Sequence, residues 1–295
     1  MYNSNIIRTI SKSSKIFLQA LETQFGNNFL YNFNSFRHST DWAKHGYERS
    51  IKEKKDIMCI ETPIIGRKLF NENSAETFFR IGINNVSSYF EQNFFIPKKI
   101  NFQRIEKILE ATDTQILPWR KTGDYILYAM QVPGDSSLLG LDIFSAAQYD
   151  LMFLRKISNR PIVISMHPDI KKGWGKKELK RHNHFYNGFL DTIEITNSTI
   201  SSLDTHTLLD DAWCTVCHTS GVSFDSIAKG VPVIALHERS FMRPLSSTSY
   251  YDVENLVMPE RMQWLAKVAY TQWNLSEITD GTFKEHVSSF YNNFT

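Results

Sequence analysis

The sequence of 295 residues has few cysteines, little net charge and no long apolar run. Its three cysteines cannot build a disulfide framework, which favours a reducing compartment. Lysine and arginine total 33 against 31 acidic residues, and this balance excludes the broad basic field of a nonspecific nucleic-acid binder. No apolar stretch nears the roughly 20 residues that cross a bilayer, and the first residues lack a signal-peptide pattern. We therefore expect a cytoplasmic protein.

Several chemical motifs are also missing. There is no Walker A loop and no Gly-x-Ser-x-Gly, so nothing supports a nucleotide triphosphatase or a hydrolase of that type. The run from Cys214 to His218 spells the haem c attachment pattern, but it lies in a predicted buried strand. Free cysteine in such a strand is commonly a small core residue, so we expect no metal and no cofactor here.

The second half of the chain has the pattern of a regular α/β domain. From Asp124 onward, short apolar runs alternate with helical patterns, which implies a parallel sheet covered on both faces. The strands predicted there are 125–132, 161–166, 192–196, 212–217 and 231–236. The predicted helices are 144–157, 176–186, 205–209, 222–228, 261–273 and 282–292.

The first half is less regular. Periodicity predicts helices at 6–21, 42–54 and 103–112 and strands at 29–33, 56–65 and 77–83. A segment with Pro, Gly and charge at 118–123 has the composition of a linker. We therefore expect an α/β protein with two Rossmann-like domains of parallel sheet, 1–120 and 121–295, of which the second is more regular. The last helices would cross back to the first domain.

Polar residues follow three of the strands predicted in the second half. Gln131 to Ser137 follow the first strand, His167 and Pro168 the second, and His218 to Asp225 the third. In such sheets ligands bind beyond the carboxyl ends of the strands. Ser220 and Gly221 open a predicted helix, where free N–H groups and the helix dipole favour an anion. The pattern predicts a phosphate-containing ligand, with a plain helix cap and a turn as the alternative interpretation.

The order Gln-x-x-x-Asp, His-Pro and Ser-x-x-x-Phe-Asp, followed by Gly-x-Pro-Val, resembles the capsule polysaccharide Kdo transferases. These are bacterial glycosyltransferases of GT-B-like architecture. The segment from Glu61 to Arg67 is similar to their Glu-x-Gly-Phe-x-Arg segment, and the resemblance spans about residues 42–236. It implies an enzyme that moves Kdo or a related acidic sugar from CMP-Kdo to a glycan or glycolipid acceptor, with retention of configuration. Such an acceptor implies peripheral contact with the inner face of the membrane.

The resemblance also implies roles for individual residues. Asp135 would be the nucleophile at the anomeric carbon, Glu61 an acid or base, and His167 would bind the donor phosphate. Arg67 and Lys171 are cations suited to a carboxylate on the donor. The other residues assigned to the donor are Gln131, Pro168, Ser220, Gly221 and Asp225. The sequence has no Asp-x-Asp, the motif through which many glycosyltransferases hold a metal, so a metal-independent enzyme is predicted.

Departures from the family pattern leave alternatives open. Asp225 stands where a Glu is usual, and Pro63 where the family has Gly. Teichoic-acid glycerophosphotransferases share the His-Pro and Ser-x-x-x-Phe-Asp elements, so an enzyme that uses CDP-glycerol is one alternative. A noncatalytic sugar- or nucleotide-binding module is another. Chemistry alone allows Asp135 to attack the donor, with retention, or to deprotonate the acceptor, with inversion.

Overall fold

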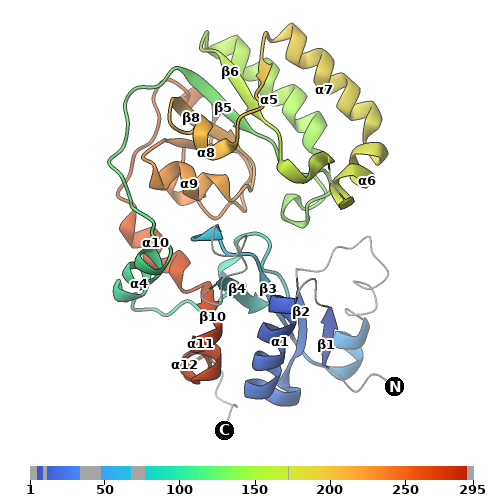
Figure 1. Ribbon diagram of the computed structural model, residues 1–295, viewed down its shortest axis with the longest axis vertical. Coiled ribbons are helices and arrows are strands. Elements are labelled where there is room, and N and C mark those ends of the chain that lie inside the picture. The colour runs from blue at the N-terminus through green and yellow to red at the C-terminus, as the bar shows by residue number, and fades with distance from the viewer. Residues whose placement is uncertain (1–4, 9–11, 34–47, 68–76, 172, 291–295) are drawn as a thin grey trace. The chain divides into compact units, whose positions relative to one another are not determined.

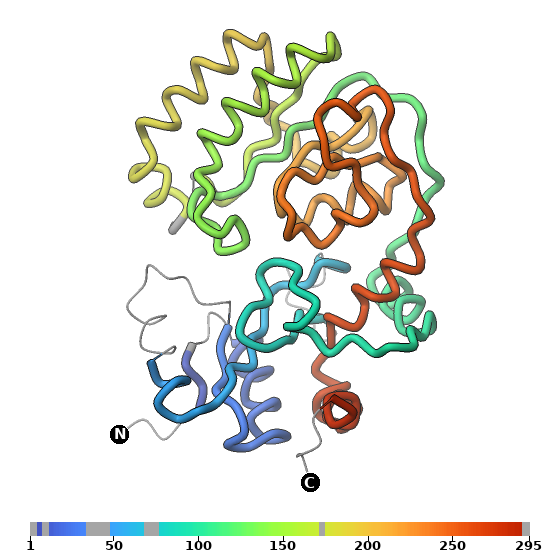
Figure 2. The backbone as a smooth tube through the Cα atoms, turned by 180° about the vertical axis from the view of Figure 1, so that it is seen from behind, coloured from blue at the N-terminus to red at the C-terminus, as the bar shows by residue number. Residues whose placement is uncertain are grey.

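The computed structural model describes residues 5–8, 12–33, 48–67, 77–171 and 173–290 and divides into two compact units (Figure 1). Unit 1 comprises Met1–Thr114 and Met262–Thr295, and unit 2 comprises Gln115–Arg261. The chain beyond Arg261, red in Figure 2, thus belongs to unit 1. We expected a division at 120/121, but the predicted linker pairs with unit 2. The backbone N–H groups of Leu117 and Arg120 donate to the carbonyls of Ala228 and Gly230, each at 2.7 Å.

Unit 1 is built on a five-stranded sheet in the order β1-β2-β3-β4-β10. Its first three strands are parallel, whereas β4 runs antiparallel to both β3 and β10. The expectation of a parallel sheet therefore holds for only part of this unit, since an antiparallel pair needs no crossover connection. The strands are β1 (Ile6–Arg8), β2 (Leu30–Phe33), β3 (Ile57–Glu61), β4 (Phe78–Ile83) and β10 (Gln272–Asn274).

The helices of unit 1 pack an aromatic core against this sheet. They include α1 (Lys12–Phe25), α4 (Gln103–Ala111), α10 (Met262–Ala269), α11 (Leu275–Thr279) and α12 (Thr282–Ser288). Helix α1 buries Phe17, Leu18, Leu21 and Phe25, which the 3.6-residue period places on one face. The centres of the Phe17 ring and the Phe79 ring on β4 are 4.6 Å apart. The helix predicted from residue 6 begins only at Lys12, because residues 6–8 pair with β2 as β1.

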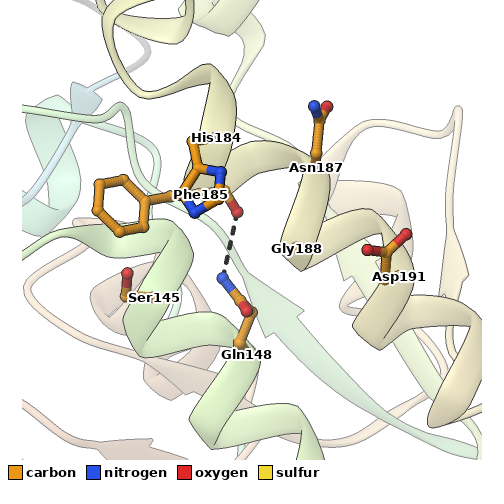
Figure 3. Close-up of a pocket in the computed structure, with 7 residues that line it drawn as sticks. All are labelled: Ser145, Gln148, His184, Phe185, Asn187, Gly188 and Asp191. Carbon is orange, nitrogen blue, oxygen red and sulfur yellow. Dashed lines mark hydrogen bonds between the residues drawn. The ribbon is translucent and has the colours of Figure 1, made fainter.

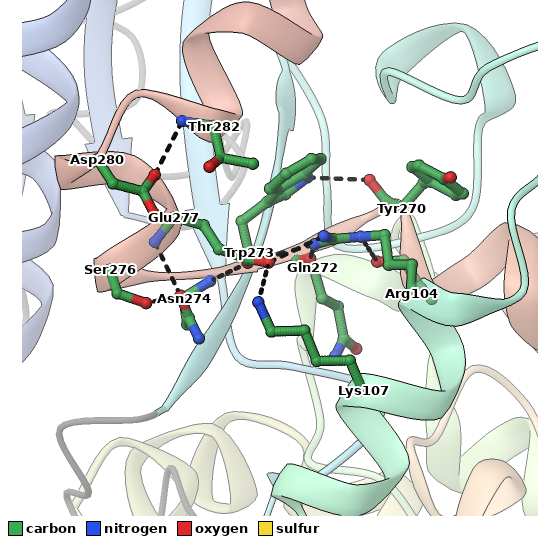
Figure 4. A network of polar contacts seen from close by, with 11 residues as sticks. Arg104, Lys107, Tyr270, Gln272, Trp273, Asn274, Ser276, Glu277, Asp280 and Thr282 are labelled. Carbon is green, nitrogen blue, oxygen red and sulfur yellow. Dashed lines mark hydrogen bonds and ion pairs between the residues drawn. The ribbon is translucent and has the colours of Figure 1, made fainter.

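A buried ion pair joins α4 to α11 (Figure 4). The carboxylate of Glu277, 3% exposed, lies 3.0 Å from the Arg104 guanidinium and 3.2 Å from the Lys107 ammonium. Glu277 also closes a capping box with Asn274 at the start of α11. The Arg104 guanidinium stacks 3.6 Å from the centre of the Trp273 ring. The residues after Arg261 are thereby fixed to the rest of unit 1 by charge as well as by packing.

Unit 2 has a fully parallel sheet in the order β7-β6-β5-β8-β9, as expected. Its strands are β5 (Tyr125–Ala129), β6 (Ile162–Ser165), β7 (Thr199–Ile200), β8 (Ala212–Cys217) and β9 (Val233–Ala235). Its α-helices are α5 (Ile143–Ile157), α6 (Gly173–Arg181), α7 (Asn183–Ile195), α8 (Thr205–Leu208) and α9 (Val222–Ala228). The α/β class predicted from the sequence is confirmed in both units.

The two faces of the unit 2 sheet carry different helices. Helices α5 and α7 lie side by side over one face, where Cys214 and Val216 of β8 join their core (Figure 1). Thr215 points to the other face, and its hydroxyl meets that of Ser226 on α9 at 2.6 Å. Burial raises the pKa of the Cys214 and Cys217 thiols. The two cysteines of the haem-like pattern are therefore packed core residues.

Three further predicted elements differ from the structure. The strand predicted at 192–196 is the end of α7, where the hydroxyls of Thr192 and Thr196 donate to helix carbonyls four residues earlier. These bonds give the threonine hydroxyls hydrogen-bond partners within the helix. The helix predicted at 176–186 is interrupted at His182, between α6 and α7. The helix predicted at 261–273 ends at Ala269, and its last residues form β10. Part of the helix predicted at 42–54 lies outside the described residues.

Candidate functional site

The carboxyl edge of the unit 2 sheet carries the loops that follow β5, β6 and β8. Because all strands of this sheet are parallel, these loops leave from the same edge, which is where α/β sheets bind ligands. Strand β5 lies between β6 and β8, so its loop has the other two as neighbours. All predicted site residues except Glu61 and Arg67 lie in these loops or in the short helices that the loops open.

Gln131, 4% exposed, links the β5 loop to the β8 loop. Its amide oxygen accepts a hydrogen bond from the Thr219 N–H at 2.8 Å. Its amide nitrogen donates to the hydroxyls of Thr219 and Ser137, at 2.9 and 3.2 Å. Those two hydroxyls lie 2.6 Å from each other. The three side chains form one buried network that fixes the two loops together.

Asp135 extends this network toward the surface. A turn that contains Pro133 and Gly134 precedes it, with Gly134 at φ 70° and the Asp135 N–H donating to the Val132 carbonyl. Asp135 Oδ1 accepts hydrogen bonds from both the N–H and the hydroxyl of Ser137, each at 2.8 Å. Among the described residues, no hydrogen bond reaches Oδ2. One carboxylate oxygen is therefore fixed by two hydrogen bonds, and the other accepts none from the described residues.

His167 lies two residues beyond β6, which pairs with β5 on the side opposite to β8. Its Nδ1 accepts a hydrogen bond from the Asp169 N–H at 3.2 Å, so the neutral ring carries its proton on Nε2. An imidazole held in this tautomer presents an N–H donor of the kind that binds a phosphate oxygen. Pro168 is exposed and opens the short 3-10 helix η4 (Pro168–Lys171). Lys171 ends that helix, and its side chain lies outside the described atoms.

Ser220 and Gly221 form the turn before α9. The Ser220 carbonyl accepts from the N–H and the hydroxyl of Ser223, at 3.2 and 2.7 Å. Gly221 is buried and occupies the N-cap position of α9. Asp225, one turn into α9, faces α8, where its Oδ2 lies 3.9 Å from Nε2 of His206. Ser220 and Gly221 thus continue directly from the Gln131 network, whereas Asp225 faces away toward a neighbouring helix.

Glu61 and Arg67 belong to unit 1, where the side chains of both form hydrogen bonds with Thr62. Glu61 ends β3 and accepts a hydrogen bond from the Thr62 N–H at 2.8 Å. Arg67 donates to the Thr62 hydroxyl at 3.2 Å. Arg80 of β4, 5% exposed, donates to the Thr62 carbonyl at 2.6 Å. This segment after β3 is therefore shaped by two arginines, of which only Arg67 was predicted as a site residue.

The sequence did not identify every polar residue at the unit 2 edge. Ser137 and Thr219 lie in the polar segments that follow β5 and β8. Their place in the sequence beside Asp135 and Ser220 is the only signal that could have identified them. His237 is a further case, two residues beyond β9. Its Nδ1 accepts from the Arg239 N–H at 3.1 Å, the same arrangement as at His167. Burial, and then the nearby His218, lower the pKa of His237, so the ring stays neutral at pH 7.

A second feature of unit 2 is an open groove of about 440 Å³ between α5 and α7 (Figure 3). Both polar and apolar surface lines it, and the amide of Gln148 donates across it to the Phe185 carbonyl at 3.1 Å. None of the predicted site residues lines this groove. Across the described ranges, no three His, Cys, Asp or Glu side chains form a group that could hold a metal ion. Nor does any helix in those ranges have the length and apolarity to cross a membrane.

The two α/β units, with polar loops at the carboxyl edge of a parallel sheet, define a GT-B-like protein. The family model described as capsule polysaccharide biosynthesis protein matches residues 67–244. Because the match covers more than half of the chain, this protein belongs to that family, and the resemblance found in the strand-end motifs is confirmed. All predicted site residues except Glu61 lie within the matched range.

Two solved structures are similar to the chain along most of its length. One is the β-Kdo 2,7-transferase of Thermosulfurimonas dismutans KpsC, with 14% identity and a TM-score of 0.52 over 96% of this chain and 91% of that chain. The other is the β-Kdo 2,4-transferase of the same protein, with 11% identity and a TM-score of 0.54 over 92% and 96%. At these identities the likeness shows a shared fold. No curated protein matches the sequence.

Proposed function

We propose that this protein is a glycosyltransferase of capsule polysaccharide synthesis that moves Kdo, or a related acidic sugar, from a CMP-linked donor to a glycan or glycolipid. Family membership and the fold shared with two Kdo transferases support the class of reaction. The observation that carries the proposal is the unequal use of the two Asp135 oxygens. Two hydrogen bonds hold Oδ1, while Oδ2 accepts none from the described residues.

The proposed reaction has two displacements at the anomeric carbon. Asp135 Oδ2 first attacks that carbon and forms a glycosyl ester, while the bond to the phosphate oxygen breaks and CMP leaves with the electron pair. The acceptor hydroxyl then attacks the same carbon, the ester bond breaks, and the aspartate carboxylate is restored. A base must take the hydroxyl proton in this second step, and Glu61 is our candidate. Two inversions give net retention.

The surrounding residues would stabilise the departing cytidylate. In its neutral form His167 carries its proton on Nε2, a kind of donor suited to a phosphate oxygen, and the Ser220-Gly221 turn follows β8, on the other side of β5 from β6. Gln131 would act by holding the β5 and β8 loops in register, since its amide is bonded to both. Arg67 and Lys171 remain our candidates for the carboxylate of the donor sugar. Asp225 would contact the nucleotide only after it turns from His206.

The proposed chemistry requires no metal, because the protein supplies the donors for the leaving group. A glycolipid acceptor would bring the protein to the inner face of the membrane as a peripheral enzyme. The nearest alternative is transfer of glycerol phosphate from CDP-glycerol, and a second is binding without turnover. These three functions differ in the donor that is consumed, CMP-Kdo, CDP-glycerol or neither.

Intact-protein mass spectrometry after incubation with CMP-Kdo, without acceptor, tests the proposal. We expect the mass of one Kdo residue to be added to the wild type and not to Asp135→Asn. Asp204→Asn is a matched control, since Asp204 also caps a short helix of unit 2, α8, through its own carboxylate. This control should still form the adduct. An adduct that persists in Asp135→Asn would exclude this nucleophile, and an adduct from CDP-glycerol alone would favour the alternative enzyme.

Binding separates an enzyme from a noncatalytic module. Free CMP should raise the melting temperature of both the wild type and Asp135→Asn, because a ligand that binds only the folded state stabilises it. UDP and ADP should have no comparable effect. Stabilisation by CMP without any adduct or turnover in the wild type would identify a binding module.

A further inference from the structure

Asp150, in the middle of α5, is a buried carboxylate that the proposed reaction does not use. It is 2% exposed and is surrounded by three hydrogen-bond donors. Its Oδ2 accepts from the Tyr128 hydroxyl at 2.5 Å and from Nε2 of His218 at 2.9 Å. Its Oδ1 accepts from the Tyr250 hydroxyl. We call these four residues the Asp150 cluster.

Both tyrosines in the cluster act as donors over the whole working pH range. Burial raises the pKa of Tyr128 and Tyr250, and the charge of Asp150 raises both further. The phenol protons therefore stay in place, and the carboxylate keeps its two hydroxyl partners. The third donor must be the Nε2–H of His218, so in the neutral ring the proton is held on that nitrogen.

Stability alone does not account for the cluster. Moving a carboxylate out of water is costly, and a buried polar group is repaid only if its partners are all present. Apolar side chains of similar volume would fill the same space at comparable or better stability. A buried polar cluster is better explained when its hydrogen bonds fix the position of a member that regular secondary structure does not fix. Three of the four residues lie within regular elements: Asp150 in α5, Tyr128 in β5 and Tyr250 in the 3-10 helix η6 (Tyr250–Asp252).

His218 is different, because it is the first residue beyond β8 and leads directly into the candidate site. The next residue, Thr219, is bonded through its N–H and hydroxyl to Gln131. Val216 packs in the core under α5, and His218, two residues on, reaches Asp150 of that helix. Two consecutive residues thus anchor the β8 loop. His218 bonds to Asp150 of α5, and Thr219 bonds to Gln131 of the β5 loop.

We propose that Asp150 and His218 are positioning residues that fix the β8 loop, Thr219 to Gly221, in the form that receives the phosphate end of the donor. This inference rests on the proposed function for the identity of the ligand. The ordering of the loop is a property of the protein alone. The two parts can therefore be measured separately.

Three variants separate positioning from packing. His218→Phe keeps a buried ring and removes the donor to Asp150. His218→Gln places an amide N–H close to the position of Nε2 and should restore the bond. Tyr250→Phe removes a different donor from the same carboxylate, in η6 and outside the β8 loop. If His218→Phe fails to fold, His218→Asn, whose amide ends one bond short of Asp150, provides the same comparison.

Hydrogen exchange of peptides that cover residues 218–224 measures loop order without any ligand. We expect exchange at least about tenfold faster in His218→Phe, and near the wild-type rate in His218→Gln and Tyr250→Phe. Tyr250→Phe should instead raise exchange at residues 249–253. Unchanged exchange in His218→Phe, or an equal rise in Tyr250→Phe, would overturn the proposal.

Calorimetric titration with CMP forms the second arm. His218→Phe should weaken CMP binding about tenfold, and His218→Gln should restore most of it. If the wild type binds no CMP, the proposed function fails, while the exchange data still decide whether the pair orders the loop. If exchange rises but CMP affinity does not change, the pair orders the loop without serving the donor, and the inference fails.

Discussion

The two units bury their charged and polar side chains in different places. In unit 1 Arg104 and Glu277, on helices far apart in the sequence, join α11 to α4, and the buried Arg80 holds the segment after β3. In unit 2 a group of buried polar residues lies where strands end, at Gln131, Thr219 and His218, and Asp150 of α5 joins it through His218. The Arg104–Glu277 pair therefore serves assembly of unit 1, whereas the networks around Gln131 and Asp150 shape one edge of the unit 2 sheet. The comparison predicts that mutations will separate stability from function along the same division.

The largest effect should come from Asp135→Asn at the edge of unit 2. The variant keeps an oxygen for the Ser137 N–H, so the turn and the melting temperature should change little. Loss of the nucleophile should lower turnover by about three orders of magnitude or more. Donor-consumption rates measured at saturating CMP-Kdo test this, alongside thermal unfolding. A loss of less than about tenfold would mean that Asp135 does not react with the donor.

The next largest effect should be on the stability of unit 1. Glu277→Gln leaves the buried Arg104 guanidinium without its counter-charge, and breaking a buried pair in this way costs about 3–5 kcal/mol of unfolding free energy. Urea unfolding of the wild type and the variant, followed by far-UV circular dichroism, measures the change. CMP binding by the folded variant should be unaffected. A cost below about 1 kcal/mol would show that the pair is not effectively buried in solution.

The same carboxylate predicts a pH dependence. Burial alone would raise the pKa of Glu277, but Arg104, the Asn274 N–H and Lys107 together lower it below its ordinary value of 4.5. A lowered pKa in the folded state gives stability that is present above the unfolded pKa and lost as pH falls through the folded pKa. Wild-type stability should therefore decline below about pH 4.5, and Glu277→Gln should show a smaller decline. Equal slopes in the two proteins would contradict this assignment.

A smaller effect is expected within β8 and its loop. Thr219→Val removes the hydroxyl that bridges Gln131 and Ser137 and should cost about 1–3 kcal/mol. It should also weaken CMP binding. Thr215→Val is the matched control, because Thr215 bonds to Ser226 on the other face of the same strand. The control should lower stability to a similar extent with CMP affinity unchanged, and equal loss of affinity in both would count against a specific role for Thr219.

The smallest effect should be at a surface pair of unit 2. Lys229 and Asp210 are 2.6 Å apart, closer than Arg104 and Glu277, but their side chains are 34% and 62% exposed. Solvent screening limits such a pair to roughly 0–1 kcal/mol. Asp210→Asn, studied by the same urea unfolding, should therefore change stability far less than Glu277→Gln. A similar cost for the two pairs would show that distance, rather than burial, governs these interactions.

Much of the second unit could be predicted from the sequence because local patterns specify it. Apolar runs separated by turn residues identify β5, β6, β8 and β9, and the strand-end rule then locates Gln131, Asp135, His167 and Ser220. The rule does not say which side chains meet. The bonds of Gln131 to Ser137 and Thr219 depend on the neighbouring positions of β5 and β8 in the sheet.

Other features were missed because their partners are distant in the sequence. Asp150 has the pattern of an ordinary helix residue, and only the packing of α5 against β8 brings it to His218. Arg104 and Glu277 are separated by 173 residues, so no local signal connects them. The strand predicted at 192–196 was wrong because β-branched residues dominate that segment, although threonine hydroxyls can bond to carbonyls within a helix.

The return of the chain to unit 1 affects the order in which the protein can fold during synthesis. Domains usually fold in the order in which the ribosome releases them. Here all of Gln115–Arg261 is made before β10, so the later unit can fold while the earlier one still lacks an edge strand. Until Gln272–Asn274 emerge, the open edge of β4 exposes unpaired backbone groups to other nascent chains, and pairing with β10 closes that edge.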